Sequence, residues 1–328
     1  MNGRVTAAGS RSEGRPSRQI NVVLRSAEPP LVSSAVPERE PAPSPSPLTQ
    51  HVLFQEIQKE LDQLVGLDQI KELVYEIYAL LQVAQMRSEA GLLSGGQVFH
   101  MIFKGNPGTG KTTVARIVAK LFQKMGVLSK GHLVEVERAD LVGEYIGHTA
   151  QKTRDLVKKA IGGILFIDEA YSLARGGEKD FGKEAIDTLV KAMEDHKNQF
   201  VLILAGYSDE IDFFMCSNPG LHSRFPIQMD FPDYNMDQLI QISELMAKER
   251  DYILMPQSMI KLKEHLQAEK DSHIHAFSNA RYVRNVIEKS IRNQAVRLLN
   301  HYVAGNPSKL ELMTLRPEDF KLPSKVVT

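Results

Sequence analysis

Residues 105–112 constrain the fold of this chain more than any other stretch, because they fit the pattern G-x-x-x-x-G-K-[ST] without a mismatch. An apolar run at 98–103 precedes the pattern, and apolar residues with helical spacing follow it at 114–121. Glycines allow backbone conformations that are closed to residues with a Cβ atom, so successive N–H groups can point into one concavity. This strand–loop–helix context predicts a phosphate-binding loop and disfavours a glycine-rich turn without a ligand.

The loop residues predicted to bind the nucleotide follow one another along the chain. We expect the Lys111 ammonium group to reach the β- and γ-phosphates of ATP, and the Thr112 hydroxyl group to be a ligand of Mg²⁺. ATP and Mg²⁺ are therefore the expected cofactors. The complete predicted loop consists of Gly105, Asn106, Pro107, Gly108, Thr109, Gly110, Lys111 and Thr112.

A second stretch, Ile164-Leu-Phe-Ile-Asp-Glu-Ala170, ends in two carboxylates. Its four consecutive apolar residues are typical of a strand that is buried on both faces of a parallel sheet. Ligand groups in such sheets gather at the carboxyl ends of the strands, where Asp168 and Glu169 stand. We therefore expect Asp168 to hold Mg²⁺, and Glu169 to polarise the attacking water as a general base.

The apolar pattern divides the chain into four parts. Residues 1–48 are rich in Pro and Ser and cannot bury enough apolar surface to offset their ordering entropy, so we expect a disordered tail. Residues 49–233 should form an α/β domain, and residues 234–310 a small helical domain without strands. Residues 311–328 are expected to be a loosely ordered C-terminal tail.

Five buried strands separated by helical segments predict a doubly wound parallel sheet, the P-loop NTPase type of α/β fold. At the start of the helical domain, Asn235 and Gln238 have the spacing of a capping box. The expected strands lie at residues 101–103, 133–136, 164–167, 200–205 and 227–231.

The composition limits the partners of the chain. Its 40 basic and 40 acidic residues cancel, so no net field favours nucleic acid or an anionic membrane. No apolar run approaches the roughly 20 residues needed to cross a bilayer, and the first residues lack the apolar core of a signal peptide. Cys216 is the only cysteine, which excludes an intrachain disulfide and suits a reducing compartment. We expect a partly buried thiol and a cytoplasmic location.

Four further segments resemble motifs of the AAA+ ATPases. Val65-Gly66-Leu67 resembles the motif on the adenine side of the nucleotide, and Glu144-Tyr-Ile-Gly147 resembles the pore loop of ring-shaped remodelling ATPases. Asn218-Pro-Gly-Leu-His-Ser-Arg224 is similar to the segment that carries the arginine finger. Asn279-Ala-Arg-Tyr-Val-Arg284 is similar to the sensor-2 helix motif.

The resemblance implies a role for individual residues. Val65 and Gly66 would contact the base, and Arg281 would connect the nucleotide state to the helical domain. Arg224 would complete the site of a neighbouring subunit, which implies a homo-oligomeric ring, by resemblance a hexamer. Tyr145 would grip a protein client along the ring axis. The implied catalytic residues are Lys111, Glu169, Arg224 and Arg281.

Longer similarities place the chain near one AAA+ group. Three segments resemble the sequences of the group that contains stage V sporulation protein K and the red-type Rubisco activases. They are residues 144–153, 165–171 and 204–207. The short helical domain favours the sporulation branch. Tyr207 departs from the Asn, Thr or Ser found at sensor 1 in most members, and Ser278 stands where the group usually has Gly.

Several residues also allow simpler interpretations. Arg224 could cap a helix or pair with Asp230, and Arg281 could form salt bridges along its helix. Tyr145 could belong to an ordinary surface. The pair His273 and His275 lacks the nearby Cys or spaced carboxylates of a metal site, so we expect it to be solvated.

Two other classes of protein share the expected fold. Neutral net charge and the lack of a basic–aromatic tract argue against a nucleic-acid motor or clamp loader, so a nucleic-acid partner is not expected. Intact Lys111, Asp168 and Glu169 argue against a scaffold that uses ATP only to assemble.

Overall fold

The computed structural model describes residues 47–93, 96–145, 147–176, 180–218, 220–272, 277–301 and 305–321. The chain divides into two units, 1–44 and 45–328, and the described residues all belong to the second. Nearly all of the expected N-terminal tail, together with His273 and His275, therefore lies outside the described residues.

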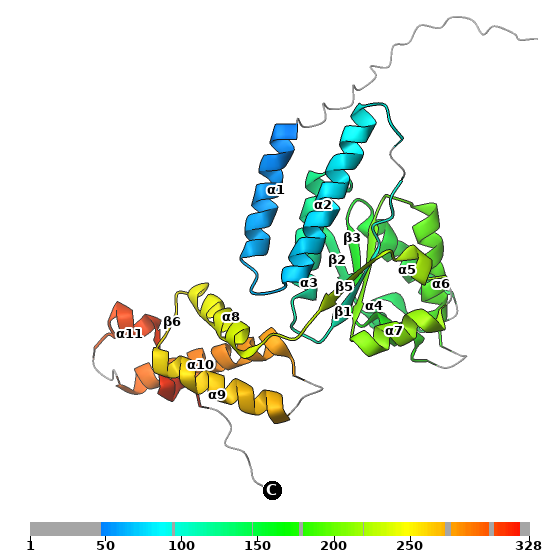
Figure 1. Cartoon of the computed structure of the whole chain (residues 1–328). Helices are drawn as coiled ribbons and strands as arrows, with labels where there is room; N and C mark the ends of the chain where they lie inside the picture. Colours follow the sequence, from blue (N-terminus) through cyan, green and yellow to red (C-terminus); the bar gives the residue numbers. More distant parts are fainter. Residues whose placement is uncertain are drawn as a thin grey trace, which may run out of the picture. The chain divides into compact units, whose positions relative to one another are not determined.

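Five parallel strands form the central sheet, in the order β2-β3-β4-β1-β5 (Figure 1). This arrangement confirms the predicted doubly wound fold. Every residue of β3 and β4 is buried, as their continuous apolar sequences predict. The strands are β1 (Met101–Gly105), β2 (Leu133–Val136), β3 (Ile164–Ile167), β4 (Val201–Gly206) and β5 (Ile227–Phe231).

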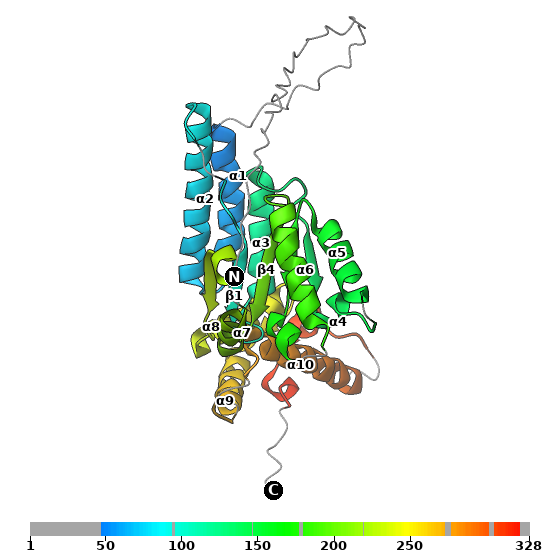
Figure 2. The same ribbon diagram turned by 90° about the vertical axis from the view of Figure 1, so that its right-hand side faces the viewer.

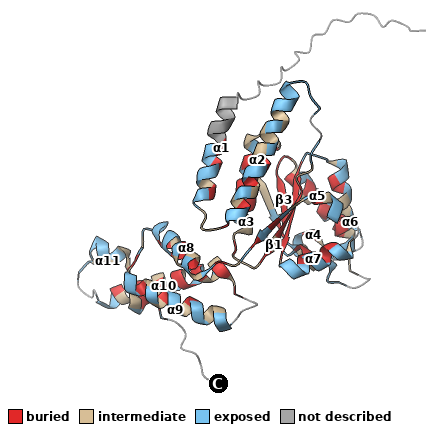
Figure 3. Cartoon of the chain, in the orientation of Figure 1, coloured by how far each residue is buried: buried red, intermediate tan, exposed pale blue. Residues whose placement is uncertain are grey.

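Helices cover both faces of the sheet, because successive strand residues point to opposite sides. Phe103 and Phe166 belong to one core, which also contains apolar residues of α1 (Pro47–Asp62), α2 (Asp68–Glu89) and α3 (Lys111–Lys124). The neighbouring residues of the same strands belong to a second core with α5, α6 and α7. Figure 2 shows the two sets of helices on either side of the sheet, and Figure 3 shows the buried residues along the strands. The second set is α5 (His148–Ala160), α6 (Gly182–Asp195) and α7 (Ser208–Ser217).

A helical lid follows β5. The predicted capping box opens α8, because the Asn235 side chain accepts a hydrogen bond from Gln238 N at 2.8 Å and the Gln238 side chain accepts one from Asn235 N at 2.9 Å. The lid helices are α8 (Met236–Lys248), α9 (Pro256–Ser272), α10 (Asn279–His301) and α11 (Lys309–Met313).

The lid departs from the sequence prediction in two ways. It contains a short parallel strand pair, β6 (Ile253–Leu254) and β7 (Thr314–Leu315), although no strand was expected there. The segment past Leu310 also packs on the lid, so its described part, to residue 321, is not a loose tail: Leu315 and Phe320 are buried. A periodic signal needs several regularly spaced apolar residues, and neither a two-residue strand nor a single buried residue provides them.

Cys216 on α7 is exposed, which corrects the expected partly buried thiol. Among the described residues, no helix is both long enough and apolar enough to cross a membrane.

Candidate nucleotide-binding site

The predicted phosphate-binding loop connects β1 to α3 and packs tightly against other segments. A Cβ atom at Gly105 would overlap the carbonyl oxygen of Phe231 in β5. A Cβ atom at Gly108 would overlap the carbonyl oxygen of Ser278, just before α10. Gly108 also has a φ of 73°, which residues other than glycine rarely adopt. The glycines are therefore required both by the shape of the loop and by its neighbours.

The Lys111 side chain points back into this loop. Its Nζ atom donates hydrogen bonds to the carbonyl oxygens of Gly105 and Asn106, at 2.8 Å each. Burial lowers the pKa of the Lys111 ammonium group, and the positive charge of Arg281 acts in the same direction. The negative charges of Asp168 and Glu169 oppose this lowering of the pKa. Residues from three parts of the sequence thus act on one ammonium group.

The two carboxylates follow β3, at its carboxyl end. The Asp168 backbone N–H donates to the carbonyl oxygen of Val136 in β2 at 3.0 Å, which extends the ladder of the sheet. Glu169 has a φ of 46°, in the left-handed region that is uncommon for a residue with a side chain. Its N–H donates to Asp168 Oδ1 at 3.0 Å. This turn orients two adjacent carboxylates, with Glu169 exposed.

A cavity of about 730 Å³ collects most of the predicted site residues. It lies between the α/β domain and the lid, and its wall includes residues from β1, α3, β4, α8 and α10 and the two carboxylates after β3. Predicted residues in the wall are Val65, Gly105, Pro107, Gly108, Gly110, Lys111, Thr112, Asp168, Glu169 and Arg281.

Three other predicted site residues, Gly66, Asn106 and Thr109, are not part of the cavity wall but contact residues near it. Gly66 lies against the Gln238 side chain of α8, and a Cβ atom there would overlap the Gln238 amide. Asn106 Nδ2 donates to the Asp233 carboxylate at 3.0 Å. Thr109 is buried, and its hydroxyl group donates to the carbonyl oxygen of Asn106 at 2.8 Å.

The oxygen donors in the cavity fit Mg²⁺ bound together with a nucleotide. The Thr112 hydroxyl group and the Asp168 carboxylate both line the cavity that contains Lys111. Mg²⁺ in phosphate sites usually takes one or two protein ligands and completes its shell with phosphate oxygens and water. Within the described part of the chain, no group of three or more His, Cys, Asp or Glu residues could hold a metal ion.

Tyr207 occupies the predicted sensor-1 position, directly after β4, and it lines the same cavity. Its ring lies 6.1 Å from the ring of Tyr171, measured between centroids. Burial raises the pKa of Tyr171 to about 12, so this phenol keeps its proton at neutral pH. Arg284 also lines the cavity beside Arg281, so the sensor-2 motif offers two guanidinium groups to a ligand.

Arg224 lies apart from this cavity. It ends a short 3₁₀ helix, His222–Arg224, and lines a different cavity of about 540 Å³. Its guanidinium group forms an ion pair with Glu194 of α6 and donates to the carbonyl oxygen of Gly220 at 2.6 Å. The partner that the sequence suggested, Asp230, is thus replaced by Glu194.

Tyr145 is exposed over 66% of its surface, between α4 (Arg138–Leu141) and α5. Its ring packs edge-on against His148, with centroids 5.4 Å apart. Gly143 N donates to the Thr149 hydroxyl group at 2.9 Å, which fixes the base of the loop. Ile146, the next residue of the predicted pore loop, lies outside the described residues.

Two residues that hold the site together were not predicted from the sequence. Tyr234 OH donates to the carbonyl oxygen of Thr109 at 3.1 Å, and the Asp233 carboxylate accepts from Asn106 and from Asn279. Both residues immediately precede the capping box at Asn235. That position, at the junction of two domains, is the only signal that the sequence carried for them.

Comparisons with known proteins agree with this geometry. Residues 101–233 match the family described as "ATPase family associated with various cellular activities (AAA)", and residues 235–327 match the AAA lid domain. The chain therefore belongs to the AAA ATPases, whose activity is ATP hydrolysis.

Its relatives define the group more closely. The chain is 56% identical over 305 residues to stage V sporulation protein K of Bacillus subtilis (strain 168), covering 93% of this chain and 94% of that protein. It is 43% identical over 270 residues to the chloroplastic ribulose bisphosphate carboxylase/oxygenase activase of Cyanidioschyzon merolae, covering 81% and 91%. Protein CfxQ of Xanthobacter flavus is 43% identical over 264 residues, with coverages of 80% and 82%. The predicted group is confirmed.

Among solved structures, a RuvB variant of Thermotoga maritima has a similar fold. The TM-score is 0.50 at 18% sequence identity, and the match covers 79% of this chain and 69% of that chain. A likeness at this level of identity supports the fold alone.

Proposed function

We propose that this AAA ATPase is a protein remodeller that assembles into a homo-oligomeric ring, a hexamer, and pulls on a protein client. The observation that carries the proposal is the division of the catalytic residues between two places. Lys111 and Glu169 line one cavity, whereas Arg224 lines another. A chain built in this way has most of a hydrolytic site, and Arg224, which lies outside that site, would act at the site of another chain.

Within the cavity, the residues have separate tasks. Lys111 and the N–H groups of the loop would neutralise charge on the β- and γ-phosphates. Glu169 would orient and polarise the attacking water. Thr112 and Asp168 would hold Mg²⁺, which supplies positive charge for the phosphate oxygens when bound.

Arg224 would act on the nucleotide of a neighbouring subunit. Its guanidinium group is partly exposed, with 31% of the side chain accessible beside Glu194. A head-to-tail contact in which each chain lends its arginine to the next generates a closed ring when the rotation closes. An arginine supplied in this way is worth about 10³–10⁵ in the hydrolysis rate of related nucleotide hydrolases.

Tyr145 would contact the client. Its ring is the exposed aromatic group of the loop that precedes α5, and an aromatic ring can grip varied polypeptides through its area without demanding a sequence. The similarity to stage V sporulation protein K supports a role in sporulation. The single cysteine supports work in the reducing cytoplasm.

The test combines assembly with hydrolysis. We expect the Glu169→Gln chain to bind ATP, to sediment as a hexamer in analytical ultracentrifugation and to release little phosphate. The unaltered chain should hydrolyse ATP under the same conditions. A chain that stays monomeric with ATP and still hydrolyses it would refute the ring, and hydrolysis stimulated by DNA would favour a nucleic-acid motor.

A further inference from the structure

Asp233 lies in the short connection between β5 and α8, where the chain passes from the α/β domain to the lid. Its carboxylate accepts hydrogen bonds from Asn106 Nδ2 at 3.0 Å to Oδ1 and 3.1 Å to Oδ2. The same Oδ1 accepts from Asn279 Nδ2 at 2.7 Å. One side chain therefore joins the phosphate-binding loop to the first residue of α10.

Asn279 is held firmly at the lid side of this connection. It is fully buried, and its φ of 46° lies in the left-handed region that Asn tolerates better than most residues. Its Oδ1 atom accepts a hydrogen bond from Tyr234 N at 3.1 Å. The orientation of the first turn of α10, which carries Arg281 and Arg284, thus depends on residues 233 and 234.

Asn106 makes the connection at the nucleotide side. Its carbonyl oxygen accepts from Lys111 Nζ at 2.8 Å, while its side-chain amide donates to Asp233. Phosphate oxygens in the cavity would compete with this carbonyl oxygen for the ammonium group of Lys111. Binding of phosphate would therefore change the hydrogen bonding of the one loop residue that Asp233 holds.

Two hydrogen bonds to carbonyl oxygens of the loop make it sensitive to the lid in the reverse direction. Ala280 N, in the first turn of α10, donates to the carbonyl oxygen of Gly108 at 3.2 Å. Tyr234 OH donates to the carbonyl oxygen of Thr109 at 3.1 Å. The loop has no free space at Gly108, so a shift of α10 must displace the loop as well.

We propose that Asp233 is a positioning residue that transmits the state of the phosphate-binding loop to α10 and so sets the position of the lid. This inference rests on the proposed nucleotide binding. The connection runs from Lys111 through Asn106 and Asp233 to Asn279. Hydrogen bonds to a carboxylate are stronger than those between neutral groups. The bonds of Asp233 to the two amides can therefore hold while a movement of the loop moves α10.

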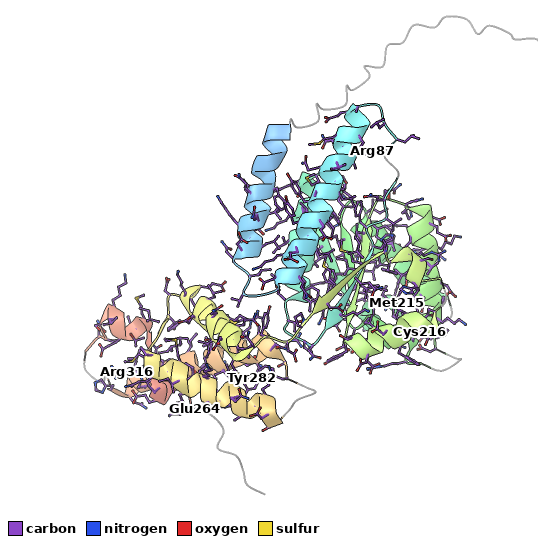
Figure 4. All side chains as sticks on the ribbon, viewed as in Figure 1. Arg87, Met215, Cys216, Glu264, Tyr282 and Arg316 are labelled. Atoms are coloured by element: carbon purple, nitrogen blue, oxygen red, sulfur yellow. The ribbon has the colours of Figure 1, made fainter. Side chains whose placement is uncertain are left out.

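The lid position can be measured with the chain's own cysteine. Cys216 is exposed on α7 in the α/β domain, and Glu264 is exposed on α9 in the lid; Figure 4 labels both. A donor and an acceptor dye attached to Cys216 and to the cysteine of a Glu264→Cys chain report the distance between them by energy transfer. The distance is recorded with and without a non-hydrolysable ATP analogue.

We expect the analogue to change this distance in the parent chain. In Asp233→Ala the change should be clearly smaller than in the parent but still present, because the contacts of Gly108 and Thr109 still join the loop to the lid, and kcat should fall. The dissociation constant for the analogue should change less than kcat. Asp233→Asn keeps one accepting oxygen and should give an intermediate response, which also covers the case in which Asp233→Ala does not fold.

The control is Asp230→Asn, which alters an exposed carboxylate on β5 only three residues away and should match the parent. A double-mutant cycle adds a second measure: Asn106→Ala and Asn279→Ala together should reduce the lid response less than the sum of their separate effects. A parent chain that does not bind the analogue would refute the proposed function. Normal binding with the full lid response in Asp233→Ala would overturn this inference alone.

Discussion

Arg224 is paired with Glu194 of its own chain, at a site separate from the cavity that contains Lys111. Glu194 is 60% exposed in this pair, so solvent screens the attraction. The guanidinium group can exchange this weak partner for a more strongly charged one at small cost. Such an exposed pair is compatible with the proposed action of Arg224 at the site of a neighbouring subunit.

Arg224→Ala should therefore bind ATP normally but hydrolyse it about 10³-fold more slowly, because trans-acting arginines contribute at least this factor. Nucleotide titration and phosphate release measure the two effects separately. Mixing the variant with Lys111→Ala chains should restore part of the activity, since each chain supplies what its neighbour lacks. An Arg224→Ala chain with parental activity as a monomer would contradict action in trans.

Glu194→Gln provides the matched control for this arginine. Removing an exposed ion pair should change the free energy of unfolding by no more than about 1 kcal/mol. ATPase activity should be retained, because the arginine itself remains. A large loss of stability in chemical denaturation would show that the pair is structural and would weaken the interpretation of Arg224→Ala.

Lys111→Ala and Glu169→Gln should fail in different ways. Loss of the ammonium group removes charge that binds phosphate, so Lys111→Ala should not bind ATP at concentrations that saturate the parent. Glu169→Gln keeps the shape of the side chain but removes the base, so it should bind ATP and hydrolyse it at least about 10²-fold more slowly. Calorimetric titration and phosphate release distinguish the two. Parental hydrolysis by Glu169→Gln would disprove the assignment of the base.

Tyr145→Ala should retain ATP binding and assembly but lose stimulation by a client and remodelling of that client. The Tyr145 ring contacts His148 and solvent, and it is absent from the wall of the nucleotide cavity. Tyr145→Phe is the control and should keep most of the function, because the ring matters more than the hydroxyl group. Should Tyr145→Ala remodel its client as well as the parent, the client must be gripped elsewhere.

His100 should make the folded chain sensitive to acid. The ring is buried beside Phe200, and its Nδ1 atom accepts a hydrogen bond from Leu202 N at 2.9 Å. Burial lowers the pKa of His100 to about 4, below its ordinary value of about 6.5. The unfolded chain therefore binds a proton first as the pH falls. Between about pH 6.5 and 4 this group should lower the free energy of unfolding by up to about 1.4 kcal/mol per pH unit.

Urea denaturation of the parent and of His100→Asn at several pH values measures this contribution. For each chain, the free energy of unfolding is plotted against pH. Both chains contain the same carboxylates, which titrate in the same range, so the difference between the two slopes reports His100. His100→Asn should be less stable at neutral pH but should lose less stability on acidification. Equal slopes in the two chains would mean that His100 is not the group responsible.

The sequence predicted the sheet well because its strands are continuous apolar runs. The run Ile164–Ile167 could be placed on a buried strand, and Asp168 and Glu169 then had to lie at its carboxyl end. The loop before Lys111 was equally clear, since its spacing is a property of consecutive residues. Both signals are local.

Contacts between distant residues gave no such signal. Tyr234 and Thr109 are 125 residues apart in the sequence, and neither contributes to a periodic pattern. The pairing of Arg224 with Glu194 depends on how α6 lies beside the segment after α7. The spacing of residues along the sequence does not determine that arrangement. The exposure of Cys216 was mispredicted for a related reason, because its apolar neighbours do not reveal which face of the helix points to solvent.

The segment after α11 sets a lower limit for any fragment of this protein that is meant to fold alone. Arg297 Nε and Nη2 donate to the two oxygens of the buried Asp319 at 2.8 and 2.9 Å, and Ser258 Oγ donates to the carbonyl oxygen of Leu315 at 2.9 Å. A lid fragment cut at residue 310 would leave Arg297 without this carboxylate and would expose the apolar surface under Phe320. Expression of the isolated lid should therefore extend at least to residue 321, or the product will aggregate.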